Sequence, residues 1–250
     1  MSLERLEDRL SRAWSPVSHM NSVVNNDQLR AAYNACLPKL TEYATELGQH
    51  TALCNAYHQV AQQPDQLDQA QRKLLENALR DFHLSGVDLP PDKKQRFKEI
   101  SQALSRLTSK YEENVLDATH AWSKLITNPA ELAGLPESAM ALAQQTATQR
   151  DQQGFLLTLE YPSYLPVMSY ADNRELRREI YTAYATRASD QGPHADQWDN
   201  SEIMQQIHQA VRFRRGCVIR LPTFSRKAVP PGVFDPTRYR TSRKRIRAIL

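Results

Sequence analysis

Residues 154–200 contain the strongest strand signal in the chain: GFLLTLEYPSYLPVMSYADNRELRREIYTAYATRASDQGPHADQWDN. The run 155–159 is short and apolar, and a glycine precedes it, which is typical of a buried strand. Pro162 and Pro166 then fall in a segment rich in tyrosine, which indicates a turn. The sequence therefore predicts one strand near residues 155–160, followed by a Tyr-rich turn.

A helix is predicted directly after this turn, over residues 174–186. Asp172 or Asn173 precedes it, and both residue types cap helix N-termini well. Its apolar side chains recur at helical spacing and form one stripe, made of Leu176, Ile180, Tyr181 and Tyr184. The polar loop that follows contains a lone Gly-Pro turn at Gly192, which does not match a phosphate-binding loop.

Helical periodicity dominates the chain before this stretch. The predicted helices cover residues 1–14, 27–48, 52–62, 67–84, 93–126 and 136–150. Ser15-Pro16 is expected to end the first helix, Asp27 to cap the second, and Pro38 to kink it. The predicted fold class is mainly α: an antiparallel helical bundle with a minor strand element.

The C-terminal part of the chain differs from the rest in charge and in pattern. Residues 210–250 hold twelve Lys/Arg and one acid, a net charge of +11, whereas residues 1–209 carry −7. Helical periodicity also breaks off after His208. We expect a helical region over 1–209, truncated at both ends, and a basic tail over 210–250 that is out of frame or disordered. The alternative is a tail that binds nucleic acid or anionic lipid. A helical sequence continuing in another reading frame would exclude that alternative.

Cysteine usage and apolar runs argue against secreted and membrane classes. Cys36, Cys54 and Cys217 are odd in number and form no Cys-x-x-Cys pair, so a disulfide framework is not expected. The N-terminal segment is charged throughout and lacks the apolar centre of a signal peptide. No apolar run approaches the about 20 residues of a membrane span. These features predict a soluble cytoplasmic protein.

Four segments resemble a known protein family, both in their residues and in their order along the chain. They are SPVSHMNSVVN (15–25), NALRDFHLSGVDLP (77–90), NVLDATHAWSKL (114–125) and PSYLPVMSYADNRELRREIYTAYATRASDQGP (162–193). Together they resemble the thimet oligopeptidase family of zinc metallopeptidases, over about residues 3–209 and only part of the N-terminal half of such an enzyme. The resemblance implies a cytoplasmic zinc endopeptidase that hydrolyses short peptides in a deep cleft. It points to no membrane or nucleic-acid partner.

The zinc helix of that family is absent from this sequence. Its His-Glu-x-x-His pattern places two imidazoles one helical turn apart on the metal, with the glutamate as general base. No histidine here is followed by Glu or by a second His four residues on; the seven are His19, His50, His58, His83, His120, His194 and His208. We therefore predict no catalytic residue, no metal ligand and no hydrolysis by this chain alone. Zinc is implied only for intact family members.

The remaining polar and aromatic candidates favour structural roles. Tyr161, Tyr164 and Tyr170 with Arg187 could line a peptide groove, but tyrosine packing with polar tips at the surface is the favoured interpretation. His50 and His58 are interpreted as surface histidines, and His120 as a packed or rim histidine. Cys36 and Cys54 are interpreted as small buried groups. Solvated faces or helix ion pairs are expected for Glu112, Glu113, Glu175 and Glu179. No substrate-binding residue is assigned. A second hypothesis is a non-catalytic helical binding module with a basic tail that binds nucleic acid.

Overall fold

The structure is a computed structural model that describes residues 3–63 and 67–218. Within these ranges it is mainly helical with one small antiparallel sheet, which confirms the predicted fold class. The elements in chain order are α1 (Leu3–Val23), α2 (Asp27–Gly48), α3 (Thr51–Ala61), α4 (Gln69–Leu84), α5 (Pro91–Ala121), β1 (Ser123–Ile126), η2 (Pro129–Leu132), α6 (Glu137–Gln149), β2 (Phe155–Thr158), α7 (Tyr161–Tyr170), α8 (Arg174–Ala185) and α9 (Ser201–Val218).

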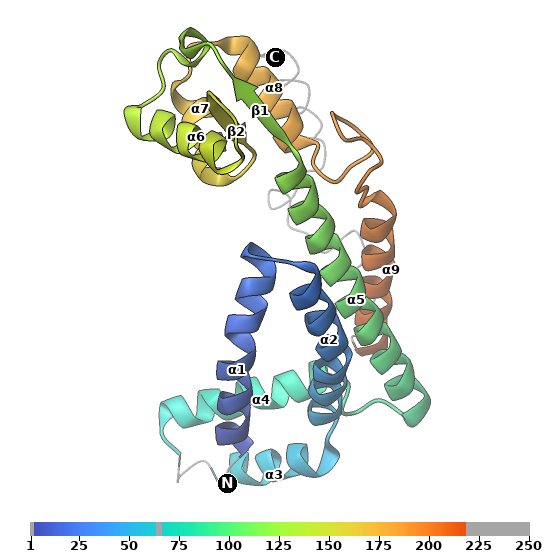
Figure 1. Cartoon of the computed structure of the whole chain (residues 1–250). Coiled ribbons are helices and arrows are strands. Elements are labelled where there is room, and N and C mark those ends of the chain that lie inside the picture. The colour runs from blue at the N-terminus through green and yellow to red at the C-terminus, as the bar shows by residue number, and fades with distance from the viewer. Residues whose placement is uncertain (1–2, 64–66, 219–250) are drawn as a thin grey trace, which may run out of the picture.

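Helix α5 is the longest element, and both α2 and α9 pack against it. Pro90 precedes it in an extended conformation, and Pro91 lies in its first turn, where a missing N–H costs no hydrogen bond. Figure 1 shows α5 between α2 and α9, with the two strands at its C-terminal end. Its buried side chains include Phe97, Ile100 and Leu104. These partners on two sides supply the packing that so long a helix needs.

The main apolar core lies where the two strands meet α6, α7 and α8. β1 pairs antiparallel with β2, so that Ser123 lies opposite Thr158 and Ile126 opposite Phe155. The buried residues of this core are Trp122, Ile126, Leu132, Ala143, Leu157, Leu159, Val167, Ala171, Leu176, Ile180 and Ala183. Because α5 passes into β1 through Trp122 alone, this core is attached directly to the long helix.

The long helix is shorter than the sequence predicted. It ends at Ala121 rather than at residue 126, and residues 123–126 form β1. Trp122 is extended, with φ −88° and ψ 131°, and its side chain is buried. Pairing with β2 satisfies the backbone of this segment and buries Ile126, which outweighs the helical spacing that continues to Leu125. The predicted strand itself is confirmed as β2.

Two prolines lie inside helices where the sequence predicted breaks. The prediction that Ser15-Pro16 ends the first helix is wrong, because α1 runs through Pro16 to Val23. Pro16 is exposed, so the carbonyl group that it leaves without an N–H partner lies within reach of water. The predicted turn after β2 is helix α7, with Pro162 in its first turn and Pro166 inside it.

The helix caps agree with the sequence at α8 and differ at α2. Asn173, one of the two predicted residues, caps α8 by accepting a hydrogen bond from the Leu176 N–H at 3.1 Å. Helix α2 is capped by Asn26 rather than by Asp27, since Asn26 Oδ1 accepts from the Leu29 N–H at 2.9 Å. Asp27 is instead the first helical residue, where its charge favours the helix dipole.

Helix α9 crosses the predicted boundary at residue 209 and continues to Val218. Most of the predicted basic tail, residues 219–250, lies outside the described residues, so the division of the chain into two regions stays a prediction. None of the helices in the described ranges combines the length and apolar character needed to cross a membrane.

Candidate functional site

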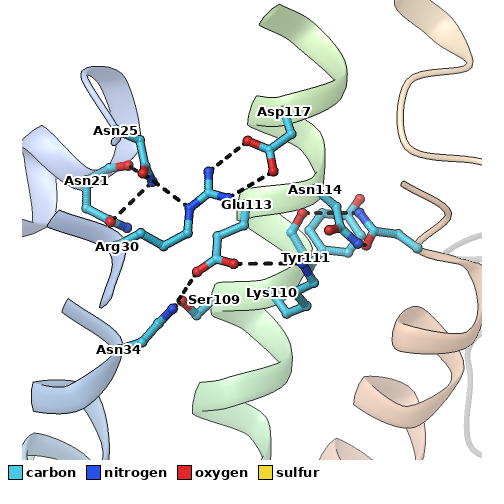
Figure 2. A network of polar contacts seen from close by, with 11 residues as sticks. Asn21, Asn25, Arg30, Asn34, Ser109, Lys110, Tyr111, Glu113, Asn114 and Asp117 are labelled. Carbon is cyan, nitrogen blue, oxygen red and sulfur yellow. Dashed lines mark hydrogen bonds and ion pairs between the residues drawn. The ribbon is translucent and has the colours of Figure 1, made fainter. Parts of the chain in front are cut away.

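A polar network joins α1 and α2 to the C-terminal half of α5 (Figure 2). Arg30 on α2 donates from Nη1 and Nη2 to the two carboxylate oxygens of Asp117 on α5, at 3.0 and 2.7 Å. Arg30 Nε also donates to Asn25 Oδ1 at 3.2 Å, and Asn25 donates to the backbone carbonyl of Asn21 at 2.9 Å. The hydrogen bond to Asp117 raises the pKa of Arg30 above its ordinary value, although burial opposes this. The network holds the end of α1 and the start of α2 against α5.

Glu113 is a buried carboxylate in the same network, with 7% of the residue exposed. Asn34 donates from Nδ2 to Glu113 Oε1 at 2.7 Å, and Lys110 Nζ lies 3.9 Å from Oε2. Ser109 Oγ donates to Asn34 Oδ1 at 3.0 Å, which fixes the amide. Of the two predicted settings for Glu113, the solvated face is wrong, because α2 covers this side of α5 and supplies the donor that a buried carboxylate needs. The predicted helix ion pair is present, with Lys110 three residues earlier on α5.

A second buried pair fastens the start of α9 to α5. Asn114 Nδ2 donates to Asn200 Oδ1 at 2.9 Å, and Asn200 Nδ2 donates to the backbone carbonyl of Tyr111 at 3.1 Å. The backbone N–H of Asn200 donates to the Ala188 carbonyl, and its carbonyl accepts from the N–H of Met204. Both asparagines are almost completely buried. Periodicity could not have predicted this pair, since neither asparagine lies on an apolar stripe and the two are 86 positions apart in the chain.

A crevice of about 270 Å³ lies between α1 and α5 beside this network. It is lined by Asn21 and Ser22 from α1, by Asn25 from the link between α1 and α2, and by Tyr111, Glu112, Glu113, Val115, Leu116 and Thr119 from α5. Its volume lies just below the about 300–1,000 Å³ of typical ligand pockets. The crevice can therefore accommodate a small ligand.

An aromatic cluster with one arginine adjoins the Thr119 end of the crevice. The rings of Tyr164 and Tyr184 stack with their centroids 3.9 Å apart, and the Arg187 guanidinium lies 3.7 Å from the Tyr184 centroid. Arg187 donates from Nη1 to Thr119 Oγ1 and from Nε to the Tyr184 carbonyl, each at 2.9 Å. The arginine is thereby held in one orientation between α8 and α5.

The four residues predicted together as groove or packing candidates separate in the structure. Tyr164 and Arg187 meet through Tyr184, which the sequence had placed only on the apolar stripe of its helix. Tyr161 and Tyr170 are 62% and 58% exposed, and neither ring stacks on this cluster within the described part of the chain. Packing with a polar tip therefore fits Tyr164, whereas Tyr161 and Tyr170 are surface side chains.

Replacing Tyr164 with Phe is expected to remove a late-ionising phenol from the alkaline titration followed by ultraviolet absorbance. Burial, then Tyr184 and Tyr181, raise the pKa of Tyr164 above its ordinary value, against the opposing charge of Arg187. The folded chain therefore retains this proton above pH about 10, where the unfolded chain loses it, and stability falls as the pH rises further. Tyr161→Phe, at an exposed position, is the control and should leave that late component in place. Equal titrations of the two variants would contradict the assignment.

The histidine candidates are surface residues, as predicted for His50 and His58. His50 caps α3, with its Nδ1 accepting from the backbone N–H of Leu53 at 3.0 Å. His120 lies at a rim: its Nε2 is 3.8 Å from Glu160 Oε1, and its side chain is 44% exposed. None of these contacts has the geometry of a nucleophile and its base.

Of the cysteine and glutamate candidates, some are buried and others lie at the surface. Cys54 is buried, and burial raises the pKa of its thiol, as suits an inert packed group. Cys36 is exposed, so the prediction that it is buried is wrong. Glu175 and Glu179 form ion pairs on the surface, with Arg178 and Lys124 respectively, as predicted. In the described ranges, no group of three His, Cys, Asp or Glu side chains could hold a metal ion.

Comparison with known proteins relates the chain to one group of enzymes. Residues 1–94 match the family described as the N-terminal domain of neurolysin and thimet oligopeptidase. Oligopeptidase A of Haemophilus influenzae is 56% identical over 209 residues, which make up 83% of this chain and 31% of that protein. The proteins of the same name from Salmonella typhimurium and Escherichia coli are 55% and 54% identical over 207 residues, or 82% of this chain and 30% of theirs. The chain thus spans about a third of the length of the curated relatives it matches.

These matches confirm the resemblance expected from the four sequence segments. They extend over most of the chain at more than half identity, and the family match covers α1 to α4 and the start of α5. The chain is therefore similar to oligopeptidase A over most of its length, and its first 94 residues match the N-terminal domain of the neurolysin and thimet oligopeptidase family.

Proposed function

We propose that this chain forms part of the helical N-terminal framework of a peptide-hydrolysing oligopeptidase. The observation that carries the proposal is the 56% identity to oligopeptidase A over 209 residues. Side chains that have no catalytic motif but lock three helices together, such as Arg30, Asp117 and Glu113, fit a framework role. The ligand class of the whole enzyme is short peptides, and its compartment is the cytoplasm, consistent with the unpaired thiols of Cys36 and Cys54.

The residues of this chain do not fit the zinc ion that the family resemblance implies. The sequence has no His-Glu-x-x-His, and the described residues bring no three potential ligands together. The contribution proposed for this chain is therefore to shape and line a space for peptides. It supplies no group to the bond-breaking step.

The proposal is tested by a chimera. The matching segment of Haemophilus influenzae oligopeptidase A is replaced with the 209 residues of this chain that align with it. If the chain is an equivalent framework, the chimera should cleave a quenched-fluorescent peptide within about tenfold of the parent, which corresponds to an activation free energy raised by less than about 1.4 kcal/mol. The isolated 250-residue chain, measured alongside, should show no cleavage above a blank and no stoichiometric zinc.

Two outcomes would contradict the proposal. One is a chimera that melts cooperatively like the parent yet cleaves no peptide, which would mean that this chain is a related fold with another role. The other is chelator-sensitive cleavage by the isolated chain, which would mean that it carries a metal site of its own. A parent enzyme with the segment deleted serves as the inactive reference.

A further inference from the structure

We propose that the crevice between α1 and α5 binds a short zwitterionic peptide of about three residues, with its carboxylate on Arg187 and its amino group near Glu112. The inference rests on the proposed function for the choice of peptides as the ligand class. The site itself is argued from the side chains that line the crevice, Glu112 among them, and from Arg187, which does not line the crevice but donates a hydrogen bond to the lining residue Thr119.

Arg187 provides the anion-binding end. The guanidinium carries five N–H donors, of which one on Nε and one on Nη1 are engaged by Tyr184 and Thr119. The side chain is partly buried and forms no ion pair with any carboxylate in the described residues. An arginine that is stacked on an aromatic ring and held by two hydrogen bonds has already lost most of its rotamer freedom. Its three remaining donors are therefore prepared to bind a carboxylate.

Glu112 provides the cation-binding end. It lines the crevice and is exposed, and it forms no ion pair within the described part of the chain. The neighbouring acids already have partners: Glu113 accepts a hydrogen bond from Asn34 and pairs with Lys110 at 3.9 Å, and Asp117 pairs with Arg30. The charges left at the crevice are thus one carboxylate at Glu112 and one guanidinium beyond Thr119.

The spacing of the two ends sets the length of the ligand. Glu112 and Thr119 lie seven residues apart on α5, which places them on one face and about 10 Å apart along the helix axis. An extended peptide covers about 3.3 Å per residue, so about three residues span this distance. The crevice volume of about 270 Å³ is consistent with so small a ligand and too small for a long peptide.

The middle of the crevice offers groups suited to a peptide backbone. Asn21 lines it and is 8% exposed, and its Nδ2 donates to no other described residue, while its Oδ1 accepts from Asn25. This amide can donate to a peptide carbonyl. Val115 and Leu116 on the opposite wall are apolar and can pack on small side chains.

The test measures the affinity of trialanine for the full 250-residue chain by isothermal titration calorimetry. Three ligands are compared: trialanine, trialanine with an amidated C-terminus, and trialanine with an acetylated N-terminus. Amidation and Arg187→Gln are each expected to weaken binding by at least about tenfold, because a charged hydrogen-bonding partner is lost. Acetylation and Glu112→Gln are expected to act in the same direction. Arg178→Gln, at an exposed position on α8, the helix that precedes Arg187, is the control and should bind trialanine as the parent does.

Which end of the peptide lies on Arg187 is decided by measuring the amidated peptide with the Arg187→Gln variant. If the peptide carboxylate sits on Arg187, amidation should cost nothing further in the Arg187→Gln chain, since the interaction is already absent. Additive losses, equal affinity for trialanine and its amide, or no binding of trialanine to the parent would each overturn the proposal. The ligand changes require no folded variant, so a variant that misfolds leaves the comparison intact. An active chimera together with a chain that binds no trialanine would reject this site while leaving the framework function standing.

Discussion

Replacing Ile180 with Ala is expected to lower the free energy of unfolding by about 2–5 kcal/mol. Ile180 is completely buried in the core formed by the two strands and helices α6, α7 and α8, beside residues such as Trp122 and Leu176. Removing three carbon atoms there loses their transfer free energy and leaves a cavity that the surrounding helices and strands fill only in part. Urea unfolding followed by circular dichroism and by tryptophan fluorescence measures the loss.

Leu74→Ala is the matched control for this variant. It also removes three carbon atoms from a helical residue, but Leu74 is 62% exposed on α4. Its cost should stay within about 0.5 kcal/mol. If the two variants lost equal stability, the core around Ile180 would have to be loosely packed in solution.

Replacing Asn200 with Ala is expected to cost about 1–3 kcal/mol, the penalty for a buried polar group left without its partner. The change removes the acceptor of the Asn114 amide and the donor to the Tyr111 carbonyl. Both asparagines are buried, so water does not readily replace the lost partners. The junction between α5 and the start of α9 should loosen first, which amide hydrogen exchange of the first turns of α9 would detect.

A double-mutant cycle separates the asparagine pair from its surroundings. Once Asn200 is gone, Asn114→Ala should add little, because the two side chains act through the same hydrogen bond. Gln197→Ala, in the exposed part of the same loop, should be close to neutral. Fully additive losses for the two asparagines would show that their contact contributes nothing of its own.

The sequence was sufficient where a local pattern and a local cap agree. Helix α8 was predicted over 174–186 and spans Arg174–Ala185, because an apolar stripe with Leu176 and Ile180 follows the Asn173 cap within one turn. The strand at residues 155–158 was likewise recognisable from its apolar run. In both cases the information that decides the structure lies within a dozen residues.

The sequence was insufficient where the deciding contact is distant. Residues 123–126 become a strand only because β2 pairs with them, and no pattern within SKLI reports that partner. The proline at position 16 is expected to end a helix, but α1 continues through it and packs on α2 nearby, where the Trp14 ring stacks on Tyr33. Propensity favours a break there by a few kcal/mol at most, which such packing can exceed.

The candidate site shows the same limit more strongly. Arg30 and Asp117 are 87 positions apart in the sequence, and Asn34 and Glu113 are 79 apart, so periodicity within a helix cannot pair them. The sequence predicts a solvated face or a helix ion pair for Glu113, and only the ion pair, with Lys110, can be anticipated from spacing within the helix. Recognising it as buried required knowing that α2 covers that face of α5.

The side-by-side packing of α5 and α9 has a consequence for the order in which the chain acquires its structure. The 79 residues between Ala121 and Ser201 must form a closed loop before the two helices can meet. Loop closure becomes costlier with length, by about 0.6 kcal/mol for each doubling, whereas β1, β2 and α6 to α8 contact one another over much shorter separations. Once the strands and those helices have assembled, they bring the two ends of the loop close together. The flexible chain that must still close for α9 to contact α5 is then much shorter. Assembly of the strands with α6 to α8 is then the fast local step, and docking of α9 on α5 is the slower long-range step. Asn200, directly before α9, lies at the junction between the two.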